Sequence, residues 1–274
     1  MVEYSSTRCK RALSKSGLPG LDYALNPYVG CEHGCAYCYS PAVLGRREYV
    51  ERWGEFVIVK ENLVELLSKE VKRLRRGCIG VGTVCDPYQP LERKTRLTGR
   101  ALEILRESGF SVCIQTKSSL VLRDIDLLDR ERDEVGVTIT TLEDDLARRM
   151  EPRASPPGER VNVLEELAST GVRRWIFLGP VIPGVNDSVE NLAGIISVAR
   201  RTGSYVIYDR LNLKVGVAER LAKVLGDSSF LRLLTSAWWR RKEAEIERLC
   251  RREGVRCEPA FGPPLRKALE RCER

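Results

Sequence analysis

The chain has 274 residues, a formal net charge of +8 and ten cysteines. This length suits one large α/β domain with a modest extension. There is no run of about eighteen apolar residues and no apolar leader, so we expect a cytoplasmic protein without a membrane partner. The basic balance favours a polyanionic partner, although an arginine-rich composition also arises from growth at high temperature. Free thiols in a reducing compartment are expected rather than a disulfide scaffold.

The first predicted strand, residues 21–28, leads the chain into a run with three cysteines. Cys31, Cys35 and Cys38 are spaced C-x3-C-x2-C, and intervening glycines allow tight turns, so three thiolates can be directed at one metal centre. A structural zinc site takes four protein ligands, and a ferredoxin-type cluster takes a fourth cysteine. A [4Fe–4S] cluster with one open iron therefore fits this spacing best. His33 is either a fourth ligand or, as its neighbours indicate, an exposed polar loop residue.

Strand and helix alternate after this run. Asn62 is the predicted N-cap of the next helix, which Gly77 ends, and residues 187–190 have the form of a capping box ahead of another helix. Alternation of strands and helices implies parallel βαβ units. The further predicted strands are residues 79–85, 111–116, 135–141, 175–178 and 205–211, and the further predicted helices or turns are residues 98–108, 120–129 and 161–169.

The end of the chain predicts a helix over residues 227–252, stopped by Gly254. The run of residues 238–242, Trp-Trp-Arg-Arg-Lys, is typical of surfaces that stack bases, but it also fits a tryptophan anchored on the core beside a solvated basic face. Cys250, Cys257 and Cys272 are spaced too widely for a familiar auxiliary cluster. A Cys250–Cys257 disulfide or free thiols are the expected alternatives.

Polar residues gather where the predicted strands end, which is where ligands of parallel α/β barrels bind. Period two places Thr83 and Cys85 on one face, and Thr138 and Thr140 on one face. A buried lysine or arginine at such a rim needs an anion.

The motif C-x3-C-x-aromatic-C, with Tyr37 as its aromatic residue, resembles the signature of the radical S-adenosylmethionine (SAM) superfamily. The wider run, residues 26–39, is similar to the branch that contains spore photoproduct lyase and proteins called DNA repair photolyases, and this likeness extends over residues 26–209. The resemblance implies a partial (β/α)6 TIM-like barrel and fails after Asn212. We therefore expect a barrel core of residues 1–211 and, from the helical pattern near the end of the chain, a helical C-terminal extension of residues 212–274.

The resemblance also implies positions for SAM, although each residue could instead cap a strand or the next helix. The implied contacts are Tyr37 with the adenine, Thr83 through Asp86 with the methionyl amino group, Lys117 and Arg153 with the carboxylate, Thr138 and Thr140 with the ribose, and Val181 through Pro183 with the adenine pocket. Spore photoproduct lyase returns a hydrogen atom from a cysteine on its second strand. Aligning the two sequences on Asp86 puts Thr83 at the position of that cysteine. Cys85, two residues later, is then either a displaced hydrogen donor or a small core residue.

The activity that this resemblance implies is reductive cleavage of SAM at the cluster to a 5'-deoxyadenosyl radical, which abstracts hydrogen from a large substrate. DNA or RNA is the expected substrate, and ferredoxin or flavodoxin the expected electron donor. Two alternatives stay open, which are radical modification of a protein or peptide side chain and a non-catalytic iron–sulfur protein that binds nucleic acid. Polar residues at the strand ends argue against the last.

Overall fold

The computed structural model describes residues 1–261, and its main sheet has eight strands in the order β11-β10-β9-β8-β7-β6-β3-β2. All neighbouring strands from β3 to β11 in this sheet pair in parallel, whereas β2 (Leu13–Lys15) pairs antiparallel with β3. The sheet is therefore wound in one direction and left open, as in a partial TIM-type barrel. The parallel strands are β3 (Tyr23–Leu25), β6 (Cys78–Val81), β7 (Ser111–Thr116), β8 (Glu134–Thr138), β9 (Arg173–Val181), β10 (Tyr205–Arg210) and β11 (Cys257–Pro259).

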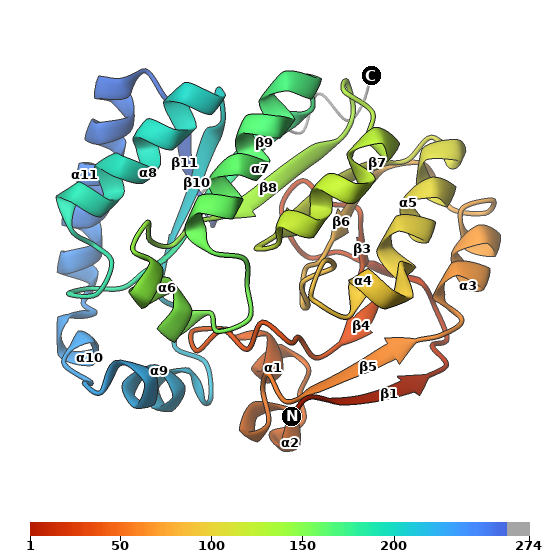
Figure 1. Cartoon of the computed structure of the whole chain (residues 1–274), viewed down its shortest axis with the longest axis horizontal. Coiled ribbons are helices and arrows are strands. Elements are labelled where there is room, and N and C mark those ends of the chain that lie inside the picture. The colour runs from red at the N-terminus through yellow and green to blue at the C-terminus, as the bar shows by residue number, and fades with distance from the viewer. Residues whose placement is uncertain (262–274) are drawn as a thin grey trace.

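Helices cover the outer face of this sheet. Figure 1 shows α11, α8 and α7 side by side over it, with α9 and α10 below them, and η1 packs between α7 and α5. Within residues 1–261, no helix combines the length and apolar character needed to cross a membrane. The helices are α1 (Ser40–Val43), α2 (Arg47–Glu51), α3 (Leu63–Glu70), α4 (Glu92–Thr95), α5 (Leu97–Ser108), the 3₁₀ helix η1 (Ser119–Leu127), α6 (Asp144–Met150), α7 (Pro157–Thr170), α8 (Val189–Thr202), α9 (Val217–Leu225), α10 (Phe230–Leu233) and α11 (Ser236–Glu253).

Alternation along each strand separates two faces of the sheet. On β7, Val112 and Ile114 are buried and belong to the main hydrophobic core, whereas the residues between them are only partly buried. Val135 and Val137 on β8 also belong to this core, although Gly136 between them is buried as well. Because successive side chains of a strand point to opposite faces, one apolar face packs against the helices and the other is left for a ligand.

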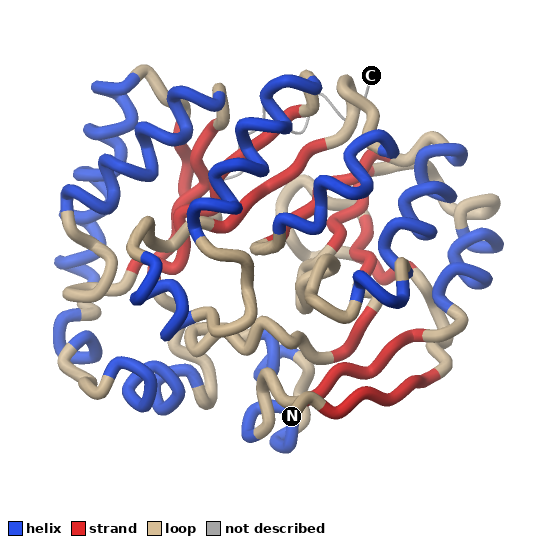
Figure 2. Tube along the Cα trace, in the orientation of Figure 1, coloured by secondary structure: helices blue, strands red, loops and turns tan. Residues whose placement is uncertain are grey.

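A second, three-stranded sheet lies beside the barrel, in the order β1-β5-β4. It is formed by β1 (Glu3–Thr7), β4 (Tyr28–Val29) and β5 (Phe56–Lys60), and Figure 2 shows the longer two as a pair of strands at the lower right. Since β4 immediately precedes the cysteines, this small sheet fixes the point at which the chain enters the cysteine loop, residues 30–39.

The predicted parallel α/β architecture is confirmed, because the six predicted strands are β3 and β6 to β10. The parallel edge strand β11 was not predicted. Strand 79–85 ends early, at Val81, because Gly82 has a φ of +92° and an added Cβ there would lie 2.4 Å from Pro87.

Three local predictions are corrected. Asn62 precedes α3, but its side chain pairs with the backbone of Cys9 instead of capping the helix. The helix that follows Asn62 ends at Glu70 and does not extend to Gly77. Helix 227–252 is split into α10 and α11 because Thr235 caps a new helix, its Oγ1 accepting a hydrogen bond from the backbone N of Trp238 at 3.1 Å.

Candidate functional site

A cavity of about 1080 Å³ lies between the concave face of the sheet and the cysteine loop. The strand residues that line it are mostly two apart in sequence, as the alternation requires. Cys31, Cys35 and Cys38 line the cavity beside the ends of the strands. From the strands come Gln115 and Lys117, Trp175, Phe177 and Gly179, and Tyr205, Ile207 and Asp209.

The three thiols of the cysteine loop are all free. Cys31 and Cys35 are only 6% and 5% exposed, and burial raises the pKa of Cys35 to about 12. A metal would have to displace these thiol protons on binding. In the described chain, no three His, Cys, Asp or Glu side chains converge on a point as a single ion requires. Three free cysteine thiols on one loop are the kind of donor that holds an iron–sulfur cluster.

Tyr37 is fixed by a buried chain of polar contacts beneath the cysteine loop. Its Oη donates to Glu151 Oε1, which also accepts from Thr140 Oγ1 at 3.1 Å, and Glu151 Oε2 forms an ion pair with Arg160. Arg160 is 1% exposed and donates further to the carbonyls of Ser155 and Thr138. Buried charges of this kind are tolerated only when paired, so the network ties the loop rigidly to the barrel.

Asp86 organises the other side of the cysteine loop. Its carboxylate accepts hydrogen bonds from Thr116 Oγ1 at 2.7 Å and from the backbone N of Lys117 at 2.8 Å, and Oδ2 lies 3.2 Å from His33 Nδ1. Burial alone would raise the pKa of Asp86, but His33 and Lys117 reverse the effect and hold it well below its usual range. The prediction that His33 is exposed is wrong, because His33 is 2% exposed and packs against this carboxylate.

Thr83 and Cys85 share one partner, the side chain of Asn26. Asn26 Nδ2 donates to Thr83 Oγ1 at 2.9 Å, and Cys85 Sγ donates to Asn26 Oδ1 at 3.8 Å. Strand periodicity does not place Thr83 and Cys85 on one face, since β6 ends at Val81. Their shared contact with Asn26 brings the two side chains together instead. Cys85 belongs to the hydrophobic core and also lines the cavity, so its position fits both a small core residue and a hydrogen donor.

The other residues expected to contact SAM fall into two groups. Tyr37, Thr83, Asp86 and Lys117 line the cavity, and Lys117 Nζ lies 6.0 Å from the centre of the Tyr37 ring. The second group is not among the residues that line the cavity. Its members are Thr138, Thr140, Arg153, Val181 and Pro183. Thr138 accepts a hydrogen bond from Gln115, and Arg153 Nη1 donates to the carbonyls of Glu32 and Gly54.

Several residues of the site were missed at the sequence level. Glu151, Arg160 and Asn26 carry no local signal for their partners, which come from distant segments. Asp209, at the end of β10, lines the cavity, and burial raises its pKa to about 6. Its place at a strand end was the signal that could have identified it.

The floor of the cavity is aromatic and charged. Trp175 is 5% exposed and stacks on Tyr205, with ring centres 6.3 Å apart. Tyr205 Oη donates to Glu134, which pairs with Arg173 at 3.0 Å. These contacts close the cavity at the end of the sheet opposite the cysteine loop.

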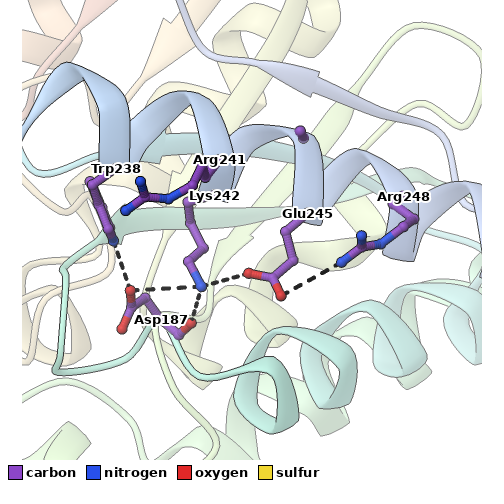
Figure 3. A pocket seen from close by; sticks show the side chains of 7 residues that line it. Asp187, Trp238, Arg241, Lys242, Glu245 and Arg248 are labelled. Carbon is purple, nitrogen blue, oxygen red and sulfur yellow. Dashed lines mark hydrogen bonds and ion pairs between the residues drawn. The ribbon is translucent and has the colours of Figure 1, made fainter.

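The Trp-Trp-Arg-Arg-Lys run lies on α11 and borders a surface pocket of about 390 Å³. Figure 3 shows Trp238 and Lys242 pointing at Asp187, with Trp238 Nε1 donating to Asp187 Oδ2 at 2.9 Å and Lys242 Nζ to the Asp187 carbonyl at 2.6 Å. Trp238 is therefore the anchored tryptophan of the second interpretation. Arg241 remains on the exposed face of the helix.

Cys250 and Cys257 are free thiols joined by a hydrogen bond, in α11 and β11. The free-thiol alternative therefore describes this pair in the structure. Cys272 lies outside the described residues.

Comparison with known proteins places this site in a family context. The model of the Radical SAM superfamily matches residues 25–195. An uncharacterized protein of Methanocaldococcus jannaschii is 34% identical over 78% of this chain and 79% of its own length. An uncharacterized protein of Mycobacterium tuberculosis is 30% identical over 74% of this chain and 64% of its own. A protein of Pseudomonas phage M6 named radical SAM Nalpha-GlyT isomerase is 27% identical over 61% of this chain and 35% of its own.

Solved structures share the fold at low sequence identity. Spore photoproduct lyase complexed with dinucleoside spore photoproduct superposes with a TM-score of 0.72 at 14% identity, over 94% of this chain and 82% of the other. A mutant of the same lyase with bound AdoMet and the same dinucleoside gives 0.71 at 13% identity, over 94% and 82%.

Proposed function

The chain belongs to the radical SAM superfamily, and from that premise we propose that Cys31, Cys35 and Cys38 hold a [4Fe–4S] cluster beside bound S-adenosylmethionine. Enzymes of this superfamily use these two cofactors, and this protein is a radical SAM enzyme. The observation that carries the proposal is the position of the three thiols at the rim of a cavity large enough for SAM and part of a substrate. When bound, the reduced cluster supplies the electron that cleaves SAM to a 5'-deoxyadenosyl radical.

The residues of the chain bind and orient SAM in this proposal. Lys117 is the cation best placed for the methionyl carboxylate, because it lines the cavity and faces the ring of Tyr37, which would pack beside the adenine. Thr83 and Asp86 would lie near the methionyl amino group. Thr138, Thr140, Val181 and Pro183, expected near the ribose and adenine, do not line the cavity, so we propose that they support its lining residues instead of contacting SAM. Arg153, expected at the carboxylate, donates to the carbonyls of Glu32 and Gly54, so its proposed role is to hold the cysteine loop.

The proposed substrate is nucleic acid, DNA or RNA. The net charge of +8 favours a polyanion, and one relative of the fold is complexed with a dinucleoside photoproduct. A base presented to a cavity on the concave face of a sheet must be flipped out or already unpaired. We place the reaction in the cytoplasm, where a carrier such as ferredoxin or flavodoxin would supply the electron.

Cys85 is the proposed hydrogen donor to the product radical. Its Sγ lines the same cavity, and burial raises its pKa to about 12, so the residue is a thiol at neutral pH. A thiol S–H is weak enough to give a hydrogen atom to a carbon radical. Cys85→Ala is expected to keep SAM cleavage but to change the ratio of products, whereas an unchanged ratio would leave Cys85 as a core residue.

The test is anaerobic. Protein reconstituted with iron and sulfide is given SAM and dithionite, and 5'-deoxyadenosine is quantified alone and with DNA, RNA or protein extract. Formation that rises with DNA or RNA supports the proposal, and a rise with protein extract alone would redirect it to a side-chain substrate. No 5'-deoxyadenosine from a fully loaded protein would refute SAM cleavage.

The matched controls are single cysteine variants. Cys31→Ala, Cys35→Ala and Cys38→Ala should each lose the absorbance of the cluster, whereas Cys250→Ala, which removes an equally buried thiol far from the loop, should keep it. Retention of the cluster in Cys35→Ala would contradict the ligand assignment.

A further inference from the structure

Helix α9 packs directly on the cysteine loop. A second hydrophobic cluster joins Val217 and Leu221 of α9 to Ala36 and Tyr37 of the loop. The start of α9 also lies close to α2, since a Cβ added at Gly216, the N-cap of α9 with a φ of +81°, would lie 2.3 Å from Val50. Glycine is needed here both for its left-handed conformation and for the missing side chain. In Figure 1, α9 lies on the same lower side of the molecule as α1 and α2, next to the loop.

Arg220 of α9 donates to three backbone carbonyls of this region. Nη2 donates to the carbonyl of Cys38 at 2.5 Å, Nε to that of Ala36 at 3.3 Å and Nη1 to that of Val50 at 3.4 Å. The two loop carbonyls belong to the last predicted cluster ligand and to a residue two positions before it. One side chain from the last third of the chain therefore holds the backbone of the cysteine loop.

The charge of Arg220 has no carboxylate partner within residues 1–261. Its neighbour Glu219 is exposed and acts on it only through its charge, without forming an ion pair with it. The guanidinium is partly buried. A partly buried cation whose hydrogen-bond acceptors are all neutral carbonyls is costly unless an anion lies nearby. This unpaired charge is a second observation, independent of the hydrogen bonds, that points to an anionic group at the loop.

A [4Fe–4S] cluster on three thiolates is such a group, because it carries net negative charge and becomes more negative on reduction. A nearby cation stabilises the reduced form more than the oxidised form, and hydrogen bonds and charge around a cluster set its potential. We propose that Arg220 is a positioning residue that holds the carbonyls of Ala36 and Cys38 and raises the reduction potential of the cluster. This inference rests on the proposed function, because it needs the cluster at the three cysteines.

The test compares Arg220→Met, which keeps the apolar stem without the charge, with Arg220→Lys, which keeps the charge. Arg149→Met is the matched control. Arg149 also braces α9, by donating to the carbonyls of Val224 and Leu225 at 2.8 Å, but it does not touch the loop. Each reconstituted protein is assayed for iron per chain, for melting temperature, and for midpoint potential by anaerobic redox titration followed by electron paramagnetic resonance.

The expected result is a midpoint potential shifted to a more negative value in Arg220→Met and largely restored in Arg220→Lys, with no shift in Arg149→Met. An unchanged potential in a fully loaded Arg220→Met protein would overturn the inference, as would an equal shift in Arg149→Met. Should Arg220→Met fail to load, Arg220→Lys decides, and a potential well below that of the wild-type protein and of Arg149→Met would refute the role of charge. Failure of the wild-type protein to bind a cluster would instead refute the proposed function.

Discussion

The buried ion pair between Arg160 and Glu151 gives the sharpest prediction about stability. Both residues are at most 2% exposed, and Glu151 also holds Tyr37 and Thr140. Arg160→Met leaves Glu151 without its ion-pair partner and frees the carbonyls of Ser155 and Thr138. Breaking a buried pair in this way costs about 3–5 kcal/mol of unfolding free energy. The corresponding fall in melting temperature is about 6–20 °C for a domain of this size.

The measurement is urea unfolding of the cluster-free protein under reducing conditions. A double-mutant cycle adds Glu151→Met and the double variant, and the two substitutions should be coupled by about 1–3 kcal/mol because they touch one network. Arg47→Met is the control, since Arg47 forms an exposed pair with Glu51 at 2.7 Å and its loss should leave stability unchanged. A loss below about 1 kcal/mol in Arg160→Met, with no coupling, would refute the reasoning.

The pH dependence of this effect has a definite sign. Burial opposes ionisation of Glu151, but Arg160 and Lys117 outweigh it and lower its pKa below 4.5. A carboxylate with a depressed pKa contributes stability above its unfolded pKa and loses it as the pH falls. The difference between the wild-type protein and Arg160→Met should therefore be largest at neutral pH and should shrink below about pH 4.5.

Three further predictions test the rest of the site. Gly136→Ala should cost about 1–3 kcal/mol, measured by urea unfolding, because its Cβ would lie 2.2 Å from the Trp175 ring; unchanged unfolding would contradict this packing. Asp209→Asn should raise the melting temperature, and the rise should grow as the pH increases from 3.8 to about 6. The reason is that ionisation of a carboxyl group whose pKa is raised in the folded state destabilises that state; a pH-independent difference would refute this. Cys257→Ala should leave cluster absorbance and iron content unchanged, since its thiol bonds to Cys250; loss of iron would assign this pair to the cluster.

Local patterns in the sequence were enough to predict the cysteine loop and the order of the strands. The C-x3-C-x2-C spacing lies within eight residues, and the alternation of apolar runs reports which side of each element faces the core. The six parallel strands and several helices followed from this periodicity. Boundaries failed where one residue decided them, as with Gly82 at the end of β6 and Thr235 between α10 and α11.

The contacts that position the loop were decided only by the tertiary structure. Glu151 lies 114 residues from Tyr37, and Arg220 lies 182 residues from Cys38, so neither pairing leaves a local pattern. His33 looked exposed because its neighbours are polar, yet it is buried against Asp86. Periodicity reports whether a side chain faces water or core, but a buried polar group needs a particular partner, and packing alone determines which distant segment supplies it.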